Sequence, residues 1–126
     1  EAAVRAALGG APDYLAARNN LGLILLKQGR TDDALHTFTR VLQAAPGNAA
    51  GLTNRALVYM NLGKTELALA DLERAADIDP QRTADVLWVL GQANREMGHA
   101  EQAERIICKA AALGHREARA RCTTAP

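Results

Sequence analysis

The stretch Ala56 to Pro80 reads ALVYMNLGKTELALADLERAADIDP and decides the fold. Apolar and small residues recur every three or four positions on both sides of Gly63, which is the spacing of a helix face. A glycine at this point suits a left-handed cap at the end of a first helix. Thr65 can then cap a second helix, and Pro80 ends it. The stretch therefore predicts two helices joined by a tight turn.

The same signals recur along the chain at a spacing of 34 residues. The recurring positions are Pro12, Pro46 and Pro80; Gly29 and Gly63, with Gly98 one residue later than expected; Ala34 and Ala68, with Ala103 also one residue late; Thr31 and Thr65; Asn20 and Asn54; and Leu21-Gly22 with Leu90-Gly91 two units and one residue later. A fixed period of this length indicates a repeat architecture, in which each unit stacks on its neighbours.

Composition favours an all-helical repeat. The chain has 126 residues, enough for one domain, and 48% of them are hydrophobic while only 3% are aromatic. A core built mainly from alanine and leucine favours helices at close spacing. No stretch alternates polar residues with β-branched or aromatic ones over a useful length, so no strand is expected.

The repeat resembles the tetratricopeptide repeat, a helix-turn-helix unit of 34 residues. The matching residues are Leu21, Gly22, Leu25, Ala34, Phe38, Val41 and Pro46 in the first unit; Leu52, Ala56, Tyr59, Ala68, Leu72, Ala75 and Pro80 in the second; and Leu87, Leu90, Gly91, Ala103, Ile107 and Ala110 in the third. The third unit departs at Asn94, where an aromatic is usual, and at Gly114-His115, where the proline belongs. Arg18 and Arg55 occupy positions that are usually apolar.

The resemblance implies an all-α fold, a right-handed superhelix of antiparallel helix pairs forming an α-solenoid. The expected parts are an N-terminal half-repeat at 1–14, repeats at 15–48, 49–83 and 84–115, and a capping helix with a tail at 116–126. In the half-repeat, Val4, Ala7 and Leu8 form an apolar face that needs the next unit to cover it. Starting inside a unit indicates excision from a longer array.

The family places the first helix of each unit on a concave surface that binds partner segments. On that surface, helical spacing predicts a peptide-binding set of Asn20, Leu23, Leu26, Lys27, Asn54, Leu57, Met60, Asn61, Trp88, Gln92 and Arg95. The leucines have no obvious place in the core of their own unit, and an exposed apolar patch usually marks a partner site. Asn20 and Asn54 resemble the asparagines with which some family members hold a peptide backbone. Contact with a second copy or with the missing upstream array is an open alternative.

A second family mode is not expected. Members that clamp the acidic C-terminal tails of chaperones carry lysine, arginine and asparagine at five concave positions. Those positions here hold Asn19, Leu23, Asn54, Asp85 and Val89, of which only Asn54 matches. Asp85 has the wrong sign of charge to hold a carboxylate.

Cys108 and Cys122 flank Gly114-His115 at nearly equal distance, so a hairpin turning there would bring the two thiols together. A disulfide and two separate thiols both stay open. A zinc site would need a fourth ligand and conventional spacing, and we expect no metal.

No catalytic constellation is expected. His36, His99 and His115 fall at helix or turn positions and are predicted to be solvated surface residues. Asp32 and Asp33 open a helix, where dipole compensation explains them. We therefore predict a non-enzymatic scaffold without a cofactor.

The expected partner class is protein or peptide. A net charge of +1 gives no broad basic face for nucleic acid, and no segment is apolar enough for membrane insertion. Self-assembly as a homo-oligomer is one alternative. Another is the non-catalytic segment of a larger enzyme, and a third is a bacterial secretion or pilus assembly factor. The localisation is open between the cytoplasm and, with a disulfide, an exported or periplasmic protein.

Overall fold

The computed structural model describes residues 12–122, and the half-repeat expected at 1–14 lies almost entirely outside them. Every regular element among the described residues is a helix. In chain order these are α2 (Pro12–Lys27), α3 (Thr31–Ala44), α4 (Ala49–Asn61), α5 (Thr65–Ile78), α6 (Pro80–Glu96), α7 (Ala100–Ala112) and α8 (Arg116–Arg121). The all-α prediction is therefore confirmed.

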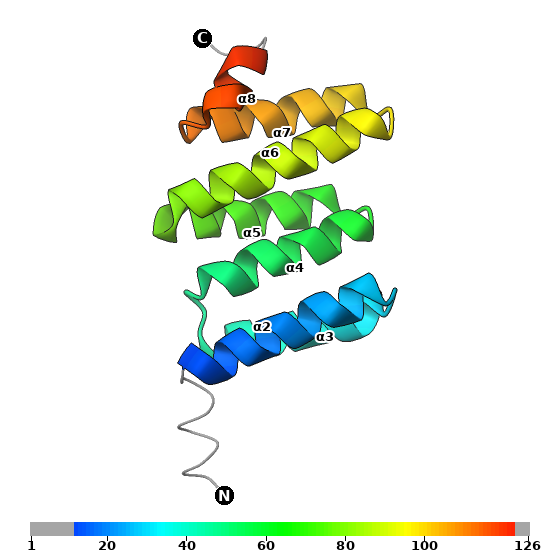
Figure 1. Ribbon diagram of the computed structural model, residues 1–126, viewed down its shortest axis with the longest axis vertical. Helices are drawn as coiled ribbons and strands as arrows, with labels where there is room; N and C mark the ends of the chain where they lie inside the picture. The colour runs from blue at the N-terminus through cyan, green and yellow to red at the C-terminus, as the bar shows by residue number, and fades with distance from the viewer. Residues whose placement is uncertain (1–11, 123–126) are drawn as a thin grey trace, which may run out of the picture. The chain divides into compact units, whose positions relative to one another are not determined.

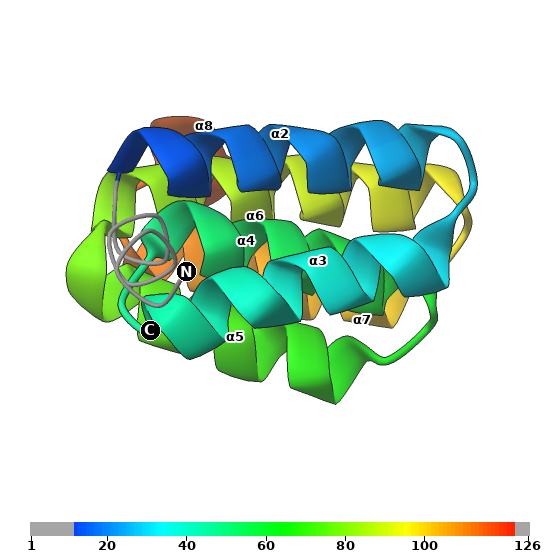
Figure 2. The ribbon, with the colours of Figure 1, turned by 90° about the horizontal axis from the view of Figure 1, so that it is seen from below.

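The chain divides into two compact units. The N-terminal unit ends at Ala75 and contains α2, α3, α4 and most of α5, while the C-terminal unit begins at Ala76 and contains α6, α7 and α8. Successive helices form the antiparallel pairs α2–α3 and α4–α5 in the first unit and α6–α7 in the second (Figure 1). Within the N-terminal unit, α3 packs against both α2 and α4 (Figure 2).

The predicted glycine turns are confirmed. Gly29, Gly63 and Gly98 follow α2, α4 and α6 with φ between 76° and 85°, a backbone region that glycine adopts without strain. At the first turn the amide of Gly29 donates to the carbonyl of Leu26, and the amide of Arg30 donates to that of Leu25. The same pair of bonds closes the other two turns, so each pair of helices is joined by the same short connection.

Two details of the helix ends differ from the sequence prediction. Thr31 and Thr65 are the first helical residues of α3 and α5, not their caps, and the N-cap of α3 is Arg30, whose side chain makes no capping bond. Pro80 opens α6 instead of closing the preceding helix. A proline fits the first turn because its missing N–H has no partner there anyway. The Asp79 carboxylate caps this helix by accepting from the amide of Arg82 at 3.1 Å.

Small residues let the paired helices approach closely, as the sequence predicted. Ala34, Ala56 and Ala68 have no exposed surface. Gly22 of α2 faces the ring of Phe38 on α3 so closely that an added Cβ would overlap ring carbons. In the C-terminal unit, a Cβ on Gly91 would lie 2.5 Å from Cγ1 of Ile107. The close contacts of α2 with α3 and of α6 with α7 thus depend on a missing side chain.

The arginine that departs from the family pattern in the second unit is neutralised inside the fold. Arg55 of α4 makes two hydrogen bonds to the carboxylate of Asp71 on α5, at 2.7 and 2.8 Å, and the Asp71 side chain is only 1% exposed. These bonds raise the pKa of Arg55 above its usual value, although burial opposes the shift. The guanidinium also lies over the ring of Tyr59 at 5.6 Å. The pair therefore replaces an apolar contact between α4 and α5.

Asn94 shows the same kind of compensation in the C-terminal unit. Its side chain is 1% exposed, in the place where the family usually has an aromatic residue. The amide donates to the carbonyl of Leu90 at 2.8 Å and accepts from Nε2 of Gln102 at 2.5 Å. These bonds satisfy a polar group that burial would otherwise destabilise.

Substitution of Gly22 by alanine tests the close contact between α2 and α3. Alanine in an unhindered helix position would stabilise the fold by about 1 kcal/mol relative to glycine. Because the new methyl group would overlap the Phe38 ring, we expect Gly22→Ala to lower the free energy of unfolding by about 1–3 kcal/mol. Urea denaturation followed by circular dichroism measures the change. Asn20→Ala on the exposed face of the same helix is the control, and a stabilised Gly22→Ala variant would contradict the packing.

Substitution of Asp71 by alanine tests the ion pair between α4 and α5. It leaves the guanidinium of Arg55 largely buried without its partner, and we expect a loss of about 3–5 kcal/mol in the free energy of unfolding. Arg74, which is 61% exposed and lies 3.2 Å from the same carboxylate, provides the matched control. Arg74→Ala should change stability by no more than about 1 kcal/mol. Equal effects of the two substitutions would show that the Arg55 pair has no special role.

Candidate functional site

The predicted binding residues of α2 divide into an exposed polar set and a half-buried apolar set. Asn20 and Lys27 are exposed, while Leu23 and Leu26 are half-buried. Both leucines pack against the core cluster of Leu25, Ala34, Phe38 and Val58. The expectation that these leucines have no place in the core was therefore wrong, because each leucine contributes part of its side chain to the interior and part to the surface.

The corresponding residues of α4 also stay accessible. Asn54, Leu57 and Met60 are half-buried, and Asn61 is exposed. The amide oxygen of Asn61 lies 3.4 Å from the Thr31 hydroxyl, which donates to it from α3. Asn61 is thus partly occupied with a contact inside the unit.

Direct contact between α2 and α4 brings the two stripes onto neighbouring helices. Both helices lie on the near side of their pairs in Figure 1. The surface of the N-terminal unit therefore combines partly accessible leucine and methionine side chains with asparagine amides. Lys27 is the single charged residue among the eight predicted residues of these two helices. Such a surface suits apolar contacts and hydrogen bonds better than ion pairing.

Asn19, next to the predicted Asn20, has a structural role that the sequence did not indicate. It is 6% exposed, and its amide donates to Oδ1 of Asn48 at 3.1 Å. The same oxygen caps α4 by accepting from the amide of Gly51 at 2.7 Å. Asn19 therefore joins α2 to the start of α4. The 34-residue period could not reveal this bond, since it links positions 29 residues apart.

The three predicted residues of α6 belong to the C-terminal unit. Arg95 is exposed, and Gln92 is half-buried. No residue between 12 and 122 donates a hydrogen bond to the amide oxygen of Gln92. Trp88 is half-buried and stacks on the ring of His115, with the ring centres 5.0 Å apart and the planes inclined by 22°. The guanidinium of Arg121 lies 5.8 Å from the centre of the indole. Trp88 is therefore partly covered from α8 and the turn that precedes it.

The prediction that all three histidines are solvated was wrong for His115. His36 and His99 are exposed, but the His115 side chain is only 12% exposed. Its Nδ1 accepts from the amide of Ala118 at 3.2 Å and so caps α8, while Nε2 lies 3.7 Å from a carboxylate oxygen of Asp85. A histidine directly before a short helix was the available signal, because side-chain acceptors are favoured at helix starts.

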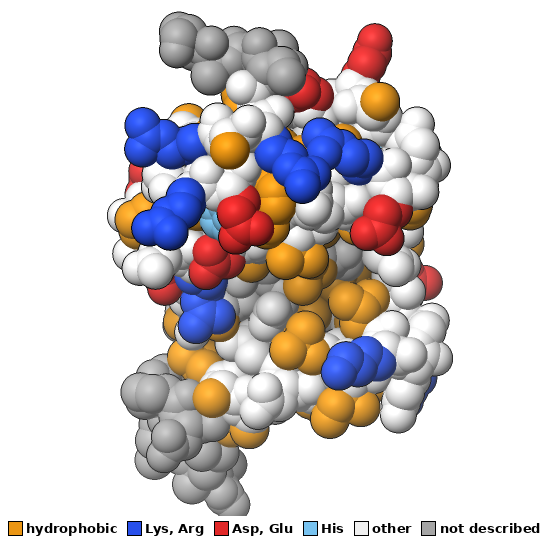
Figure 3. All heavy atoms as spheres, turned by 45° about the horizontal axis from the view of Figure 1, so that its top comes forward, with side chains coloured by type: hydrophobic (Ala, Val, Ile, Leu, Met, Phe, Trp, Pro, Cys, Tyr) orange, Lys and Arg blue, Asp and Glu red, His pale blue; other side chains and the backbone are white. Residues whose placement is uncertain are grey.

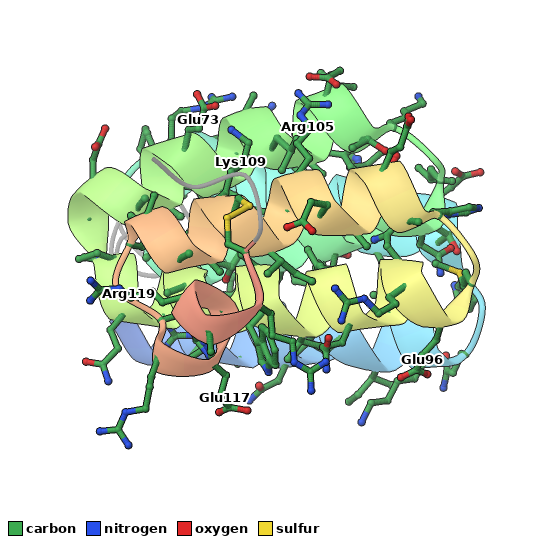
Figure 4. The ribbon with its side chains drawn as sticks, turned by 90° about the horizontal axis from the view of Figure 1, so that it is seen from above. Glu73, Glu96, Arg105, Lys109, Glu117 and Arg119 are labelled. Carbon is green, nitrogen blue, oxygen red and sulfur yellow. A yellow bond between two sulfur atoms is a disulfide. The ribbon has the colours of Figure 1, made fainter. Side chains whose placement is uncertain are left out.

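Cys108 of α7 and Cys122, which follows α8, are joined by a disulfide (Figure 4). The carboxylate of Glu104 completes a trio with the two sulfurs, all within 4.8 Å of one another. Metal ligation by cysteine requires a thiolate. Because both sulfurs are used in the disulfide, this trio does not offer a thiolate site in the oxidised protein.

The face shown in Figure 3 carries side chains of both signs of charge. On this face, Lys and Arg side chains are interspersed with Asp and Glu side chains. This distribution differs from the clustered basic face of a typical nucleic-acid binder. None of the helices among residues 12–122 combines the length and apolarity that a bilayer span requires.

Comparison with known proteins agrees with the repeat. The family model described as tetratricopeptide repeat matches residues 21–106. No curated protein sequence matches the chain. The first TPR domain of Spaghetti (RPAP3), solved with an HSP90 peptide, is a similar structure with a TM-score of 0.63 and 24% identity, covering 86% of each chain.

Two similar bacterial structures are longer proteins. PilF of Pseudomonas aeruginosa has a TM-score of 0.60 and 27% identity, and the match covers 76% of this chain and 43% of PilF. A tetratricopeptide repeat protein of Parabacteroides merdae has a TM-score of 0.61 and 29% identity, with 88% of this chain and 44% of that one covered. The present chain thus spans less than half the length of either protein.

The family match, the 34-residue period and the helix pairs agree with one another. They confirm the predicted α-solenoid fold class and support a protein-interaction module, a role for which this fold is typically used without catalysis. The chain belongs to the tetratricopeptide repeat family.

Proposed function

We propose that the protein binds an extended segment of a partner protein along the first helices of its repeats, with α2 and α4 as the main contact surface. The observation that carries this proposal is the pair of half-buried apolar stripes, Leu23 with Leu26 and Leu57 with Met60, on two helices in contact. Side chains that are rigidly seated in the core but still reach the surface lose little conformational freedom on binding. They are therefore favourable anchors for a partner's apolar side chains.

The asparagines supply the polar part of the proposed site. A side-chain amide offers both donors and an acceptor, so it can bond the N–H and C=O groups of an extended backbone. Asn20 is exposed and Asn54 is half-buried, so both amides reach the surface of the N-terminal unit. In the C-terminal unit, Trp88, Gln92 and Arg95 of α6 are proposed as partner contacts on that unit's own surface.

An acidic chaperone tail is not the partner that these residues favour. The related RPAP3 domain was solved with the HSP90 peptide SRMEEVD, but its 24% identity supports the fold alone. Of the five positions that would form the carboxylate clamp here, Asn19 is buried and bonded to Asn48, and Asp85 carries a negative charge. The partner segment is instead expected to be mainly apolar and uncharged.

A finer proposal is that the protein is a bacterial pilus or secretion assembly factor, and among the similar structures PilF of Pseudomonas aeruginosa is the one that suggests it by name. The Cys108–Cys122 disulfide agrees with an exported location. A non-catalytic segment of a larger enzyme is the alternative, which the full reading frame of the parent protein would decide.

A matched pair of substitutions tests the proposed surface. A peptide library screened against the purified full chain provides a ligand, whose affinity is then measured by calorimetry. Leu57→Glu places a charge in the apolar stripe, and we expect it to cost at least about 1.4 kcal/mol, a tenfold loss of affinity. Asn54→Ala should weaken binding less, by about 1 kcal/mol, because one or two hydrogen bonds are lost.

Leu67→Glu is the control for Leu57→Glu. Leu67 lies in the same unit on the second helix of the pair, α5, and is 49% exposed. It introduces the same charge without touching the proposed surface, so the affinity should be unchanged. Weaker binding by Leu67→Glu together with wild-type affinity of Leu57→Glu would place the partner on the opposite helices and overturn the proposal.

The exposed face of α2 raises the alternative of self-assembly, and we propose that residues 1–11 cover this face instead. Ile24 is 52% exposed, whereas Val58, its equivalent one repeat later, is fully buried against Ala34 and Phe38 of α3. A helix placed before α2 as α3 is placed before α4 would therefore cover Ile24. Val4 is the residue one period before Phe38.

Substitution in residues 1–11 tests whether this segment or a second copy of the chain covers α2. Val4→Glu should reduce the free energy of unfolding by about 1–3 kcal/mol, as for a disrupted apolar contact. Ala6→Glu is the control, because Ala6 is one period before the exposed Arg40 and should have little effect. Light scattering should give a monomer for the wild type. A wild-type dimer with unchanged stability of Val4→Glu would instead favour a second copy as the cover of α2.

A further inference from the structure

We infer that the Cys108–Cys122 disulfide is a redox-controlled lock that holds α8 over Trp88, and that its reduction releases α8 and uncovers the indole. Every residue of this lock lies in the C-terminal unit. The lock bears on the proposed function because Trp88 is one of the residues suggested to contact the partner, and it can be tested without a partner.

The helix α8 is too short to be stable alone. It has six residues, and a helix this short makes too few backbone hydrogen bonds to offset the free-energy cost of nucleation. Ala118 is the one residue of α8 that is buried. Since alanine buries a single methyl group, this contact contributes little hydrophobic stabilisation. The other five residues of the helix are exposed, and Glu117 and Arg119 point away from α7 in Figure 4.

The contacts between α8 and α6 are also limited. The His115 ring stacks on Trp88, and Arg121 lies over the same indole from the other end of the helix. Arg121 is exposed, and interactions of this kind are weak at exposed sites. Beside His115 the surface is hollowed, with a space of about 440 Å³ lined in part by Pro80, Asp85 and Glu117. Solvent therefore reaches the start of the helix.

The disulfide holds both the end of α8 and the segment before it. It joins residues 14 positions apart, and the closed loop contains the α7–α8 turn and all of α8. Closing a loop of this size removes much of the conformational freedom that the segment would gain on detaching. With the bond intact, Cys122 stays beside α7 and Ala118 returns to its site. With the bond broken, α8 is held only by non-covalent contacts, chiefly its packing on α7 around Ala118 and the contacts of His115 and Arg121 with Trp88.

Reduction by a dithiol supplies the required chemistry. The two thiols of dithiothreitol close to a cyclic disulfide and give two electrons and two protons to the protein. The S–S bond between Cys108 and Cys122 breaks, and each sulfur becomes a thiol. Release of His115 and α8 then leaves one face of the Trp88 ring open to water or to another ligand.

Trp88 is the only tryptophan of the chain, so its fluorescence reports the state of α8 directly. We expect addition of dithiothreitol to the full-length protein to shift the Trp88 emission maximum to longer wavelength and to increase quenching by acrylamide. The double variant Cys108→Ser/Cys122→Ser should show the shifted emission without reductant and should not respond to it. Arg119→Ala, an exposed substitution on the same helix that keeps the disulfide, should behave as the wild type.

A second variant separates the packing of α8 from the redox chemistry. Ala118→Glu places a charge in the buried site while the disulfide remains, and it should increase the quenching of Trp88 to a smaller extent than reduction does. Far-ultraviolet circular dichroism should show that reduction costs no more helix than α8 contains. Unchanged emission and quenching after complete reduction, verified by counting two free thiols, would overturn the inference. Loss of most of the helical signal would also overturn it, because the bond would then hold the whole unit and not a local cover.

Discussion

The close approach of paired helices at glycine is the constraint on which the rest of the structure depends. Gly22 allows the ring of Phe38 to lie against the backbone of α2, and Gly91 does the same for Ile107 on α6. Because only 3% of the residues are aromatic, the core obtains its density from short distances between helices and not from large side chains. The one phenylalanine of the chain is fully buried at such a contact.

The candidate binding surface follows from the same geometry. With Phe38 seated against Gly22, the neighbouring residues Leu23 and Leu26 fall at the edge of the core and stay partly accessible. The second helix of a pair covers one side of the first and leaves the other side free for a ligand. Polar substitutions elsewhere keep this arrangement intact, since Arg55 is paired with Asp71 and Asn94 with Gln102. Each unit can thus deviate from the family's residue pattern at one largely buried position and still keep its helix packing.

Much of the fold was predictable because the residues that determine it repeat about every 34 positions. The glycine turns at Gly29 and Gly63 and the buried alanines occur at fixed spacing, and each has a local physical cause in backbone conformation or side-chain size. Helical spacing alone was also enough to predict which residues form the stripes on α2 and α4. Their use by a partner remains a proposal, since spacing identifies a surface but not what covers it.

The features that the sequence did not reveal are bonds between residues outside the period. Asn19 reaches Asn48, and Arg55 reaches Asp71 across 16 residues, so neither partner could be chosen from one helix pattern. His115 was expected to be solvated because its short helix α8 could not be placed against Trp88 from sequence. Helix starts were misplaced by one or a few residues at Thr31 and Pro80, where side-chain capping and proline each permit two positions.

The central claim is that the first helices, and not the second, bind the partner. Nuclear magnetic resonance spectra of the labelled full chain, recorded with increasing amounts of a bound peptide, test it residue by residue. The account predicts that the largest shift changes fall on the amides of α2 and α4 around Leu23, Asn54 and Leu57. Changes concentrated on α3 and α5 instead, with those three residues unaffected, would contradict it.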